Sequence, residues 1–308
     1  MNQLLIQVRK DLKLLSTDAR FIFLIVALAA IAFIVAFQAC SSYVMSAKSS
    51  SIVTAASIII DQKVNLGQYW TILLAIDSAI FIVAGSLAMA AEKDSGMLRY
   101  TLTSGCDKNR FFASKFLVLM MMVAIAVIVS LVAYLVAFSM MDMPTLGVDV
   151  LAASMLFPTI VLLVFSSLGL LLASISGKKA IPIIMAIFLF FLLSTMFSLS
   201  GSMGASDAYQ ANPNVALSNV TEYFPPLFKA MQISNPLVLT QGTYLSIGVA
   251  PQDFASIYNP VWFDAIGGVI LGLVMMMIFL GIGYAAFRTE RLDKPGDNSG
   301  VLGRILGR

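Results

Sequence analysis

Residues 116–140 read FLVLMMMVAIAVIVSLVAYLVAFSM, an uninterrupted run without a charged side chain. About 20 apolar residues in a helix cross a hydrocarbon core about 30 Å thick. Backbone groups in lipid must pair within their own segment, which favours an α-helix. The run is too continuous for a strand of a transmembrane barrel, where apolar and polar residues alternate over about ten residues. This stretch therefore predicts a transmembrane helix.

Five further apolar runs lie on either side of this stretch. None of the six contains Lys or Arg, although one carries Asp77 and another carries Asp264 near its start. Pro158 lies in the fourth run, and we expect it to kink that helix or to mark its true beginning. The sequence predicts an all-α, polytopic membrane protein with six transmembrane helices, at about residues 21–40, 70–91, 116–140, 150–175, 180–200 and 262–287.

The composition of the whole chain agrees with this class. The 308 residues are 59% hydrophobic and only 11% charged, whereas soluble domains are about a quarter charged. So few polar groups cannot cover a water-exposed surface, and part of the solvent must be hydrocarbon. We expect an N-terminal cytoplasmic interfacial helix at 1–20, the six-helix domain at 21–290 and a short cytoplasmic tail at 291–308.

Lys and Arg gather on one side of the predicted bundle. With both termini placed in the cytoplasm, all but three of the 19 Lys and Arg residues lie on the cytoplasmic side, and the exceptions are Lys48, Lys63 and Lys229. Such an excess marks cytoplasmic loops. We therefore expect a multi-pass protein of the plasma membrane with both termini inside, and with residues 201–261 outside. The net charge of +3 then reflects orientation rather than nucleic-acid binding.

The residue inventory excludes several kinds of catalytic and metal site. The chain has no His and two Cys, which excludes His-ligated haem or zinc and Ser-His-Asp chemistry within it. Gly177-Lys178 is the nearest fragment to a Walker A loop, but Lys179 stands where Ser or Thr is required. We expect no catalytic residue, no bound cofactor and no metal in this chain, which is not predicted to be an enzyme.

Asp77 is the one acidic residue well inside a predicted span. A charge at that depth is costly and is a functional candidate. It could face a translocation path, pair with a polar group from another span, or lie in a wet outer vestibule. Asp264 is closer to the interface, and we expect it to be a boundary residue.

Residues 2–16 have the pattern of an amphipathic helix on the cytoplasmic leaflet. Leucines and Val8 recur at helical spacing, and the polar residues fall largely on another side. The alternative is an ordinary basic flank that orients the first span. The apolar positions are Leu4, Val8, Leu12 and Leu15, and the polar ones are Gln3, Gln7, Lys10 and Lys13.

Residues 92–115 form the most informative cytoplasmic segment and read EKDSGMLRYTLTSGCDKNRFFASK. We expect a short helix, which Gly105 can end in a left-handed conformation. Asp107 can then cap the next helix, which continues into the third span. The residues that would share one side of the short helix are Met97, Leu98, Thr101 and Leu102.

This segment resembles the second cytoplasmic segment of ABC type-2 exporter permeases. The resemblance rests on the pattern E-x-x-x-G-x-L-x-x-x-L, followed by a turn and R-x-x-x-x-K. The family usually has Thr after the Gly and Pro within the turn, where this chain has Met97 and Ser104-Gly105-Cys106. The matching positions are Glu92, Gly96, Leu98, Leu102, Arg110 and Lys115.

The resemblance implies a function for the whole chain. In that family the segment is a coupling helix that docks on a separate ATP-binding subunit, so Met97 and Thr101 would join the six matching positions in the coupling site. A second permease copy, or a related permease, would complete the path through the lipid. ATP and Mg would bind in the partner subunit, and no nucleic-acid partner is implied.

The outer segment at 201–261 is long, and Asn235-Pro236 should break its apolar part into short helices. Permeases of this family often have short helices that dip back before the sixth span, which implies an outer gate. The alternative is a surface cap without contact to substrate. Asn219 begins an Asn-Val-Thr glycosylation sequon on the expected outer side.

Two other functions are compatible with six spans. An ion-gradient transporter would carry several intramembrane charges or broken helices in repeated halves, whereas this chain has one central Asp and no visible repeat. A membrane scaffold without transport activity is the second alternative, and co-purification of a soluble Walker A protein would discriminate against both.

Overall fold

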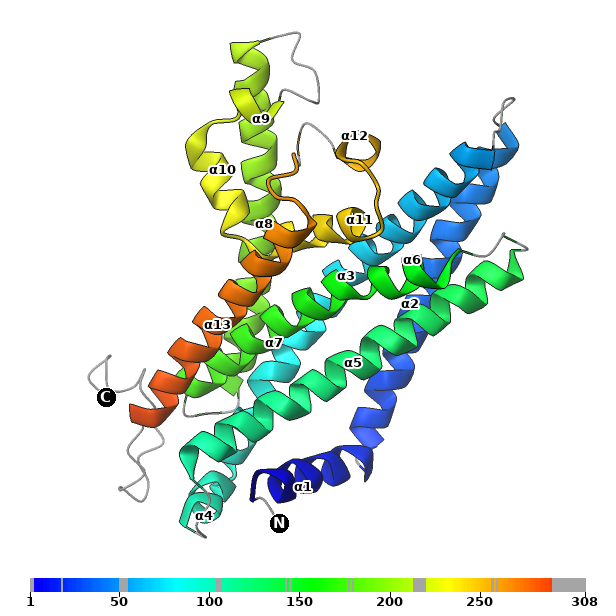
Figure 1. Ribbon diagram of the computed structural model, residues 1–308. Helices are drawn as coiled ribbons and strands as arrows, with labels where there is room; N and C mark the ends of the chain where they lie inside the picture. The colour runs from blue at the N-terminus through cyan, green and yellow to red at the C-terminus, as the bar shows by residue number, and fades with distance from the viewer. Residues whose placement is uncertain are drawn as a thin grey trace.

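The computed structural model describes residues 3–17, 19–49, 55–103, 107–141, 143, 146–176, 178, 180–212, 220–255, 258 and 260–289. Within these ranges every regular element is helical and no strand occurs (Figure 1). Six helical segments are long and apolar enough to cross a membrane. The predicted all-α, polytopic fold is therefore confirmed.

The spans and the segments between them follow one another in a simple order. The spans are α2 (Ala19–Ser49), α3 (Ala55–Asp94), α5 (Lys108–Met140), α6 (Val148–Ser154) with α7 (Leu156–Ile175), α8 (Ala180–Ala211) and α13 (Ala265–Thr289). Two short helices, α1 (Gln3–Thr17) and α4 (Met97–Thr103), belong to the segments predicted to be cytoplasmic, and we call the end that carries them the inner end. The segment predicted to be outside, called the outer segment, holds α9 (Val220–Tyr223), α10 (Pro226–Ile233), the 3₁₀ helix η2 (Pro236–Gln241), α11 (Gly242–Ser246) and α12 (Pro251–Phe254).

Several helices extend well beyond the apolar runs that predict them. The second run begins at residue 70, whereas α3 begins at Ala55 and passes through Asp61 and Lys63 without a break. Charged residues end a lipid-facing run, but they do not end a helix whose backbone bonds continue in the headgroup layer. The fifth span likewise continues to Ala211 as α8.

Pro158 marks the beginning of a helix, as one of the two sequence-based alternatives has it. The chain is helical to Ser154, turns at Met155, and resumes at Leu156, so Pro158 lies in the first turn of α7. Proline has no N–H to donate and its ring clashes with the carbonyl four residues earlier. The fourth span is therefore built from two helices, α6 and α7.

Helix α7 is the centre of the bundle. In its most apolar window 72% of the residues are buried within the chain, against 11% for α8 and 17% for α13. Its contact with α3 is close, because a Cβ at Gly85 would lie 2.2 Å from the Ser166 carbonyl oxygen and one at Gly169 would lie 2.1 Å from that of Ile82. Small residues allow such close approach of transmembrane helices.

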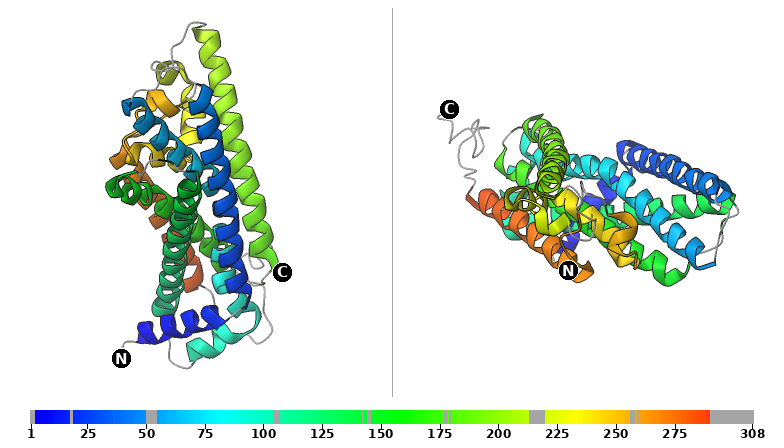
Figure 2. Two further views of the ribbon diagram at one scale, coloured as in Figure 1. Left: turned by 90° about the vertical axis from the view of Figure 1, so that its right-hand side faces the viewer. Right: turned by 90° about the horizontal axis from the view of Figure 1, so that it is seen from above.

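The two ends of the bundle carry different secondary elements. Helices α1 and α4 and the last turns of α13 lie at one end, and α9 to α12 lie at the other (Figure 1). A view turned by 90° shows the same separation, with α1 lying crosswise at the base (Figure 2). The first and last described helices thus share one end, as an even number of spans requires.

Candidate coupling site

Helix α4 follows directly on the inner end of α3. Gly96 separates the two helices with a φ of 72°, and a Cβ there would meet no heavy atom of the described residues within 4 Å. Glycine is needed at this turn for its backbone conformation and not for space. The short helix of the sequence-based expectation is confirmed as α4.

The outward face of α4 differs from the expected one. Leu98 is 3% exposed and Thr101 7%, and Leu102 is half-buried beside Leu98. Met97 is instead 50% exposed and Tyr100 75%. Leu98 is therefore a packing residue of the inner end, and the surface open to a partner carries Met97 and Tyr100. Helical spacing grouped Met97 with Leu98, Thr101 and Leu102, but Met97 lies on the exposed side, and spacing alone does not say which face meets the bundle.

An aromatic cluster supports the inner side of α4. Phe111 and Phe112 at the start of α5 surround Phe287 from α13, with ring centroids 5.8 Å and 6.1 Å from that of Phe287. Leu98 packs into the same cluster. We call these four residues the inner aromatic cluster, because they join the inner ends of three helices, α4, α5 and α13.

A buried group of three charges holds the same region together. Lys115 Nζ on α5 donates a hydrogen bond to Asp11 Oδ2 on α1 at 2.9 Å and another to Glu92 Oε1 on α3. The three side chains are 6%, 7% and 17% exposed, in the order Lys115, Asp11 and Glu92. Lys115 Nζ also lies 5.0 Å from the centroid of the Phe111 ring. This charged triad ties the N-terminal helix to the two spans that flank α4.

Three of the sequence-predicted positions therefore come together, and one partner was missed. Glu92 and Lys115 meet directly, and Gly96 lies in the turn one helical turn after Glu92. Arg110 is exposed on the first turn of α5. Asp11 was not expected here; its only signal is that it is an acidic residue in an otherwise basic segment.

The start of α5 agrees with the expected cap. Asp107 is the N-cap of α5 with extended backbone angles, although its side chain makes no capping hydrogen bond to this helix. Gly105 and Cys106 lie outside the described residues, as does Asn219, the first residue of the sequon. The side chain of Arg99 is likewise outside the described set.

Lys93 links the end of α3 to the end of α7. Its Nζ donates to the carbonyl oxygens of Ser174 at 2.9 Å and Ser176 at 3.1 Å. The last carbonyls of a helix have no partner within the helix, and a Lys there also suits the negative end of the helix dipole. The central helix of the bundle is thus pinned to the segment that leads into α4.

The outer segment breaks where the sequence predicts. Helix α10 ends at Ile233, Asn235 caps η2 by accepting from the Leu237 N–H at 3.0 Å, and Pro236 begins η2. All residues of η2 are buried. Asn235 Nδ2 also donates to the Leu193 carbonyl of α8 at 2.7 Å. This segment packs into the bundle instead of lying loosely over it.

Asp77 is buried inside a single chain. It is 1% exposed, and its Oδ1 has no hydrogen-bond partner among the described residues. Asp77 therefore does not face an open, water-filled outer vestibule in this structure. Asp264 precedes α13, and its Oδ1 accepts from the Gly267 N–H at 2.8 Å. Its place at the membrane boundary stays a prediction.

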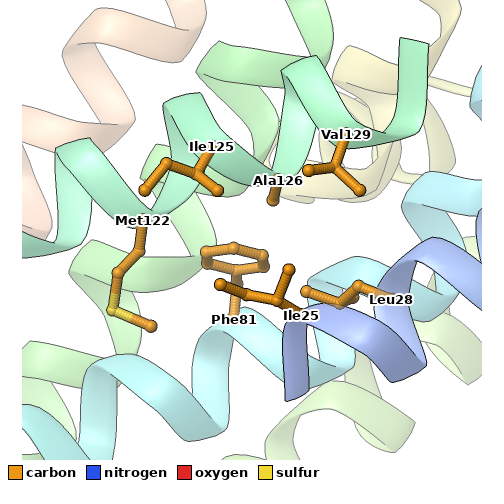
Figure 3. Close-up of a pocket in the computed structure, with 7 residues that line it drawn as sticks. All are labelled: Ile25, Leu28, Phe81, Met122, Ile125, Ala126 and Val129. Carbon is orange, nitrogen blue, oxygen red and sulfur yellow. The ribbon is translucent and has the colours of Figure 1, made fainter. Parts of the chain in front are cut away.

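A narrow slit opens between α2, α3 and α5 (Figure 3). Its cavity volume is about 10 Å³, about the minimum that holds one water molecule. A transported molecule does not fit. The lining is entirely apolar and consists of Ile25, Leu28, Phe81, Met122, Ile125, Ala126 and Val129.

The inner end thus has the features of a protein-docking surface. A short helix exposes Met97 and Tyr100, and its Leu98 packs into the inner aromatic cluster. Groups of three or more His, Cys, Asp or Glu residues that could hold a metal do not occur among the described residues.

Comparison with known proteins assigns the family. The family model described as ABC-2 family transporter protein matches residues 5–292. No curated protein sequence matches the chain significantly. The match covers all six spans, α1, α4 and the outer segment, and the chain therefore belongs to the ABC-2 transporter family as a multi-pass membrane component of transport.

Proposed function

We propose that this chain is the membrane-spanning permease subunit of an ATP-driven exporter. Two copies, or one copy and a related permease, form the path across the plasma membrane. A separate ATP-binding-cassette subunit binds ATP and Mg, and it docks on the inner end of each permease. Both termini and α4 are cytoplasmic, and the outer segment forms a lid over the path.

The observation that carries this proposal is the construction of α4. The side of α4 that faces the bundle is fixed by Leu98 in the aromatic cluster. The opposite side presents a large aromatic residue, Tyr100, that is 75% exposed. Tyrosine is enriched among the residues that dominate binding energy at protein interfaces, where one such anchor is worth about 2 kcal/mol or more. A surface built in this way suits an apolar groove on a soluble partner.

The proposed path lies between two chains. The slit between α2, α3 and α5 is apolar and too small for a transported molecule, and a larger cavity of about 680 Å³ lies at the outer segment rather than across the bundle. ATP binding would draw two docked subunits together and displace α4, and the attached spans would then open a path between the permeases. Nucleotide must bind one of the two arrangements more tightly for this to occur.

The test is a pair of charge substitutions on the exposed face of α4. In the variant Met97→Asp with Tyr100→Asp, two charges would enter an apolar contact, which is costly without a partner. We expect normal insertion and purification, together with loss of the co-purifying Walker A protein. The matched control is Val148→Asp, at an 82% exposed position on α6 at the other end of the molecule. Retention of the ATP-binding subunit by the double variant would refute docking through α4.

A further inference from the structure

Helix α13 is held very unevenly along its length. Only five of its residues are buried: Gly268, Gly272, Met275, Gly283 and Phe287. Three of these are glycines, and Met275 and Phe287 are the two with large side chains. A Cβ at Gly272 would lie 2.3 Å from Ile160 Cγ2, and one at Gly283 would lie 3.1 Å from Leu171 Cα. The contact between α13 and α7 is therefore close along the helix.

Phe287 is the largest of the five buried side chains of α13. It is 1% exposed at the inner end of α13 and is stacked by Phe111 and Phe112. Lys93 Nζ and Lys108 Nζ each lie 6.0 Å from the centroid of its ring. Two aromatic rings and two cations from α3 and α5 therefore surround one side chain of α13, an arrangement in which cation–π attraction adds to burial.

The surroundings of Phe287 connect α13 to the docking surface. Leu98, on the inner side of α4, belongs to the same cluster. Lys108 Nζ also donates to the Arg288 carbonyl at 3.3 Å, and Tyr284 donates to Asn109 Oδ1, so α5 and α13 are joined by polar contacts as well. These polar contacts lie at the inner end of α13, whereas its close packing against α7 continues along the helix.

We propose that Phe287 is a positioning residue through which displacement of α4 reaches the sixth span. The inference rests on the proposed docking of an ATP-binding subunit on α4. Phe287 is enclosed by two rings of α5 and shares a cluster with Leu98 of α4, so displacement of the α4–α5 unit is passed to α13, because close-packed contacts cannot open or overlap without cost. The movement of α13 would thus depend on the ring of Phe287 in addition to docking.

The test measures displacement in the complete complex with its ATP-binding subunit, reconstituted in lipid nanodiscs. Spin labels are placed at Leu156→Cys on α7 and Ile282→Cys on α13, which are both exposed, in a background with Cys40 and Cys106 replaced by Ala. Pulsed electron resonance then gives the distance distribution without nucleotide and with Mg and a non-hydrolysable ATP analogue. Phe287→Leu keeps an apolar side chain but removes the ring, and Phe279→Leu, a half-buried position on the same helix, is the matched control.

We expect the nucleotide to shift the distance in the unsubstituted complex and in Phe287→Tyr and Phe279→Leu. Phe287→Leu should retain the ATP-binding subunit and lose most of the shift. An unchanged shift in Phe287→Leu would overturn the inference, as would the absence of any shift in the unsubstituted complex. Failure of the ATP-binding subunit to co-purify with the unsubstituted chain would instead refute the proposed function on which the inference rests.

Discussion

The inner and outer ends of the molecule are held together by different forces. At the inner end, Lys115 joins Asp11 and Glu92, and rings from α5 enclose Phe287. At the outer end, η2 and α11 lie in van der Waals contact with the bundle: a Cβ at Gly242 would lie 2.0 Å from the Phe157 ring, and one at Gly67 would lie 2.3 Å from Tyr244. A buried ion pair and rings hold one end together, and close packing around glycine is combined with the Phe224–Trp262 and Tyr244–Phe254 ring contacts at the other.

This difference has a functional meaning under the proposed mechanism. A charged triad and an aromatic cluster can keep many of their contacts while the elements that carry them shift together as a unit. Interlocked packing around glycine has no such tolerance, because interiors are close-packed and small displacements create clashes or voids. We therefore expect the inner end to transmit movement and the outer end to resist it.

The largest expected effect comes from removing the cation of the charged triad. Lys115→Met would leave two buried carboxylates, Asp11 and Glu92, without their counter-charge. Breaking a buried ion pair in this way costs about 3–5 kcal/mol. We expect a markedly lower unfolding temperature of the purified chain, measured by thermal scanning in nanodiscs.

The control for this prediction removes all three charges at once. Lys115→Met combined with Asp11→Leu and Glu92→Met leaves no buried ion, and apolar replacements of similar volume for a buried ion pair are often neutral. The triple variant should recover most of the lost stability. Equal unfolding temperatures for Lys115→Met and the unsubstituted chain would show that the triad does not hold the inner end.

A smaller effect is expected from overpacking the outer end. Gly242→Ala places a methyl group against the ring of Phe157, which is fully buried. Extra carbon in a packed core costs about 1–3 kcal/mol. We expect the Gly242→Ala variant to show a moderate fall in unfolding temperature. In the same variant, amide hydrogens of α11 should exchange faster than those of α4.

Gly281→Ala is the matched control for the outer-end prediction. A Cβ at Gly281 would meet no heavy atom of the described residues within 4 Å, and Ala is preferred over Gly within a helix. This variant should unfold at or slightly above the original temperature. If Gly242→Ala behaves like Gly281→Ala, the outer end is not held by close packing and the contrast between the two ends disappears.

The fold was predictable because its signals are local. Apolar runs indicate the spans. Pro158 indicates the break between α6 and α7, and Asn235-Pro236 indicates the break before η2. The ends of α3 were not predictable in this way, since a hydropathy run stops at the first charges and the helix continues past them. The proposed sidedness and the domain limits stay predictions from the distribution of Lys and Arg.

The candidate site was predictable only in part. Glu92 and Lys115 were singled out together, and they meet in the structure. Their third partner, Asp11, comes from a helix about 80 residues or more away in the sequence, and no local spacing encodes such a contact. The choice between Leu98 and Tyr100 as the outward residue also depends on how α4 packs, which Phe111 and Phe287 decide.

A photo-crosslinker at position 100 tests the central claim most directly. The amino acid p-benzoylphenylalanine replaces Tyr100 in cells, and the same substitution at Val148, at the other end of the molecule, is the control. After irradiation, we expect position 100 to give a covalent product with a soluble protein whose peptides include a Walker A loop, and position 148 to give none. Products containing only lipid or a second copy of this chain at position 100 would contradict the account that α4 docks an ATP-binding subunit.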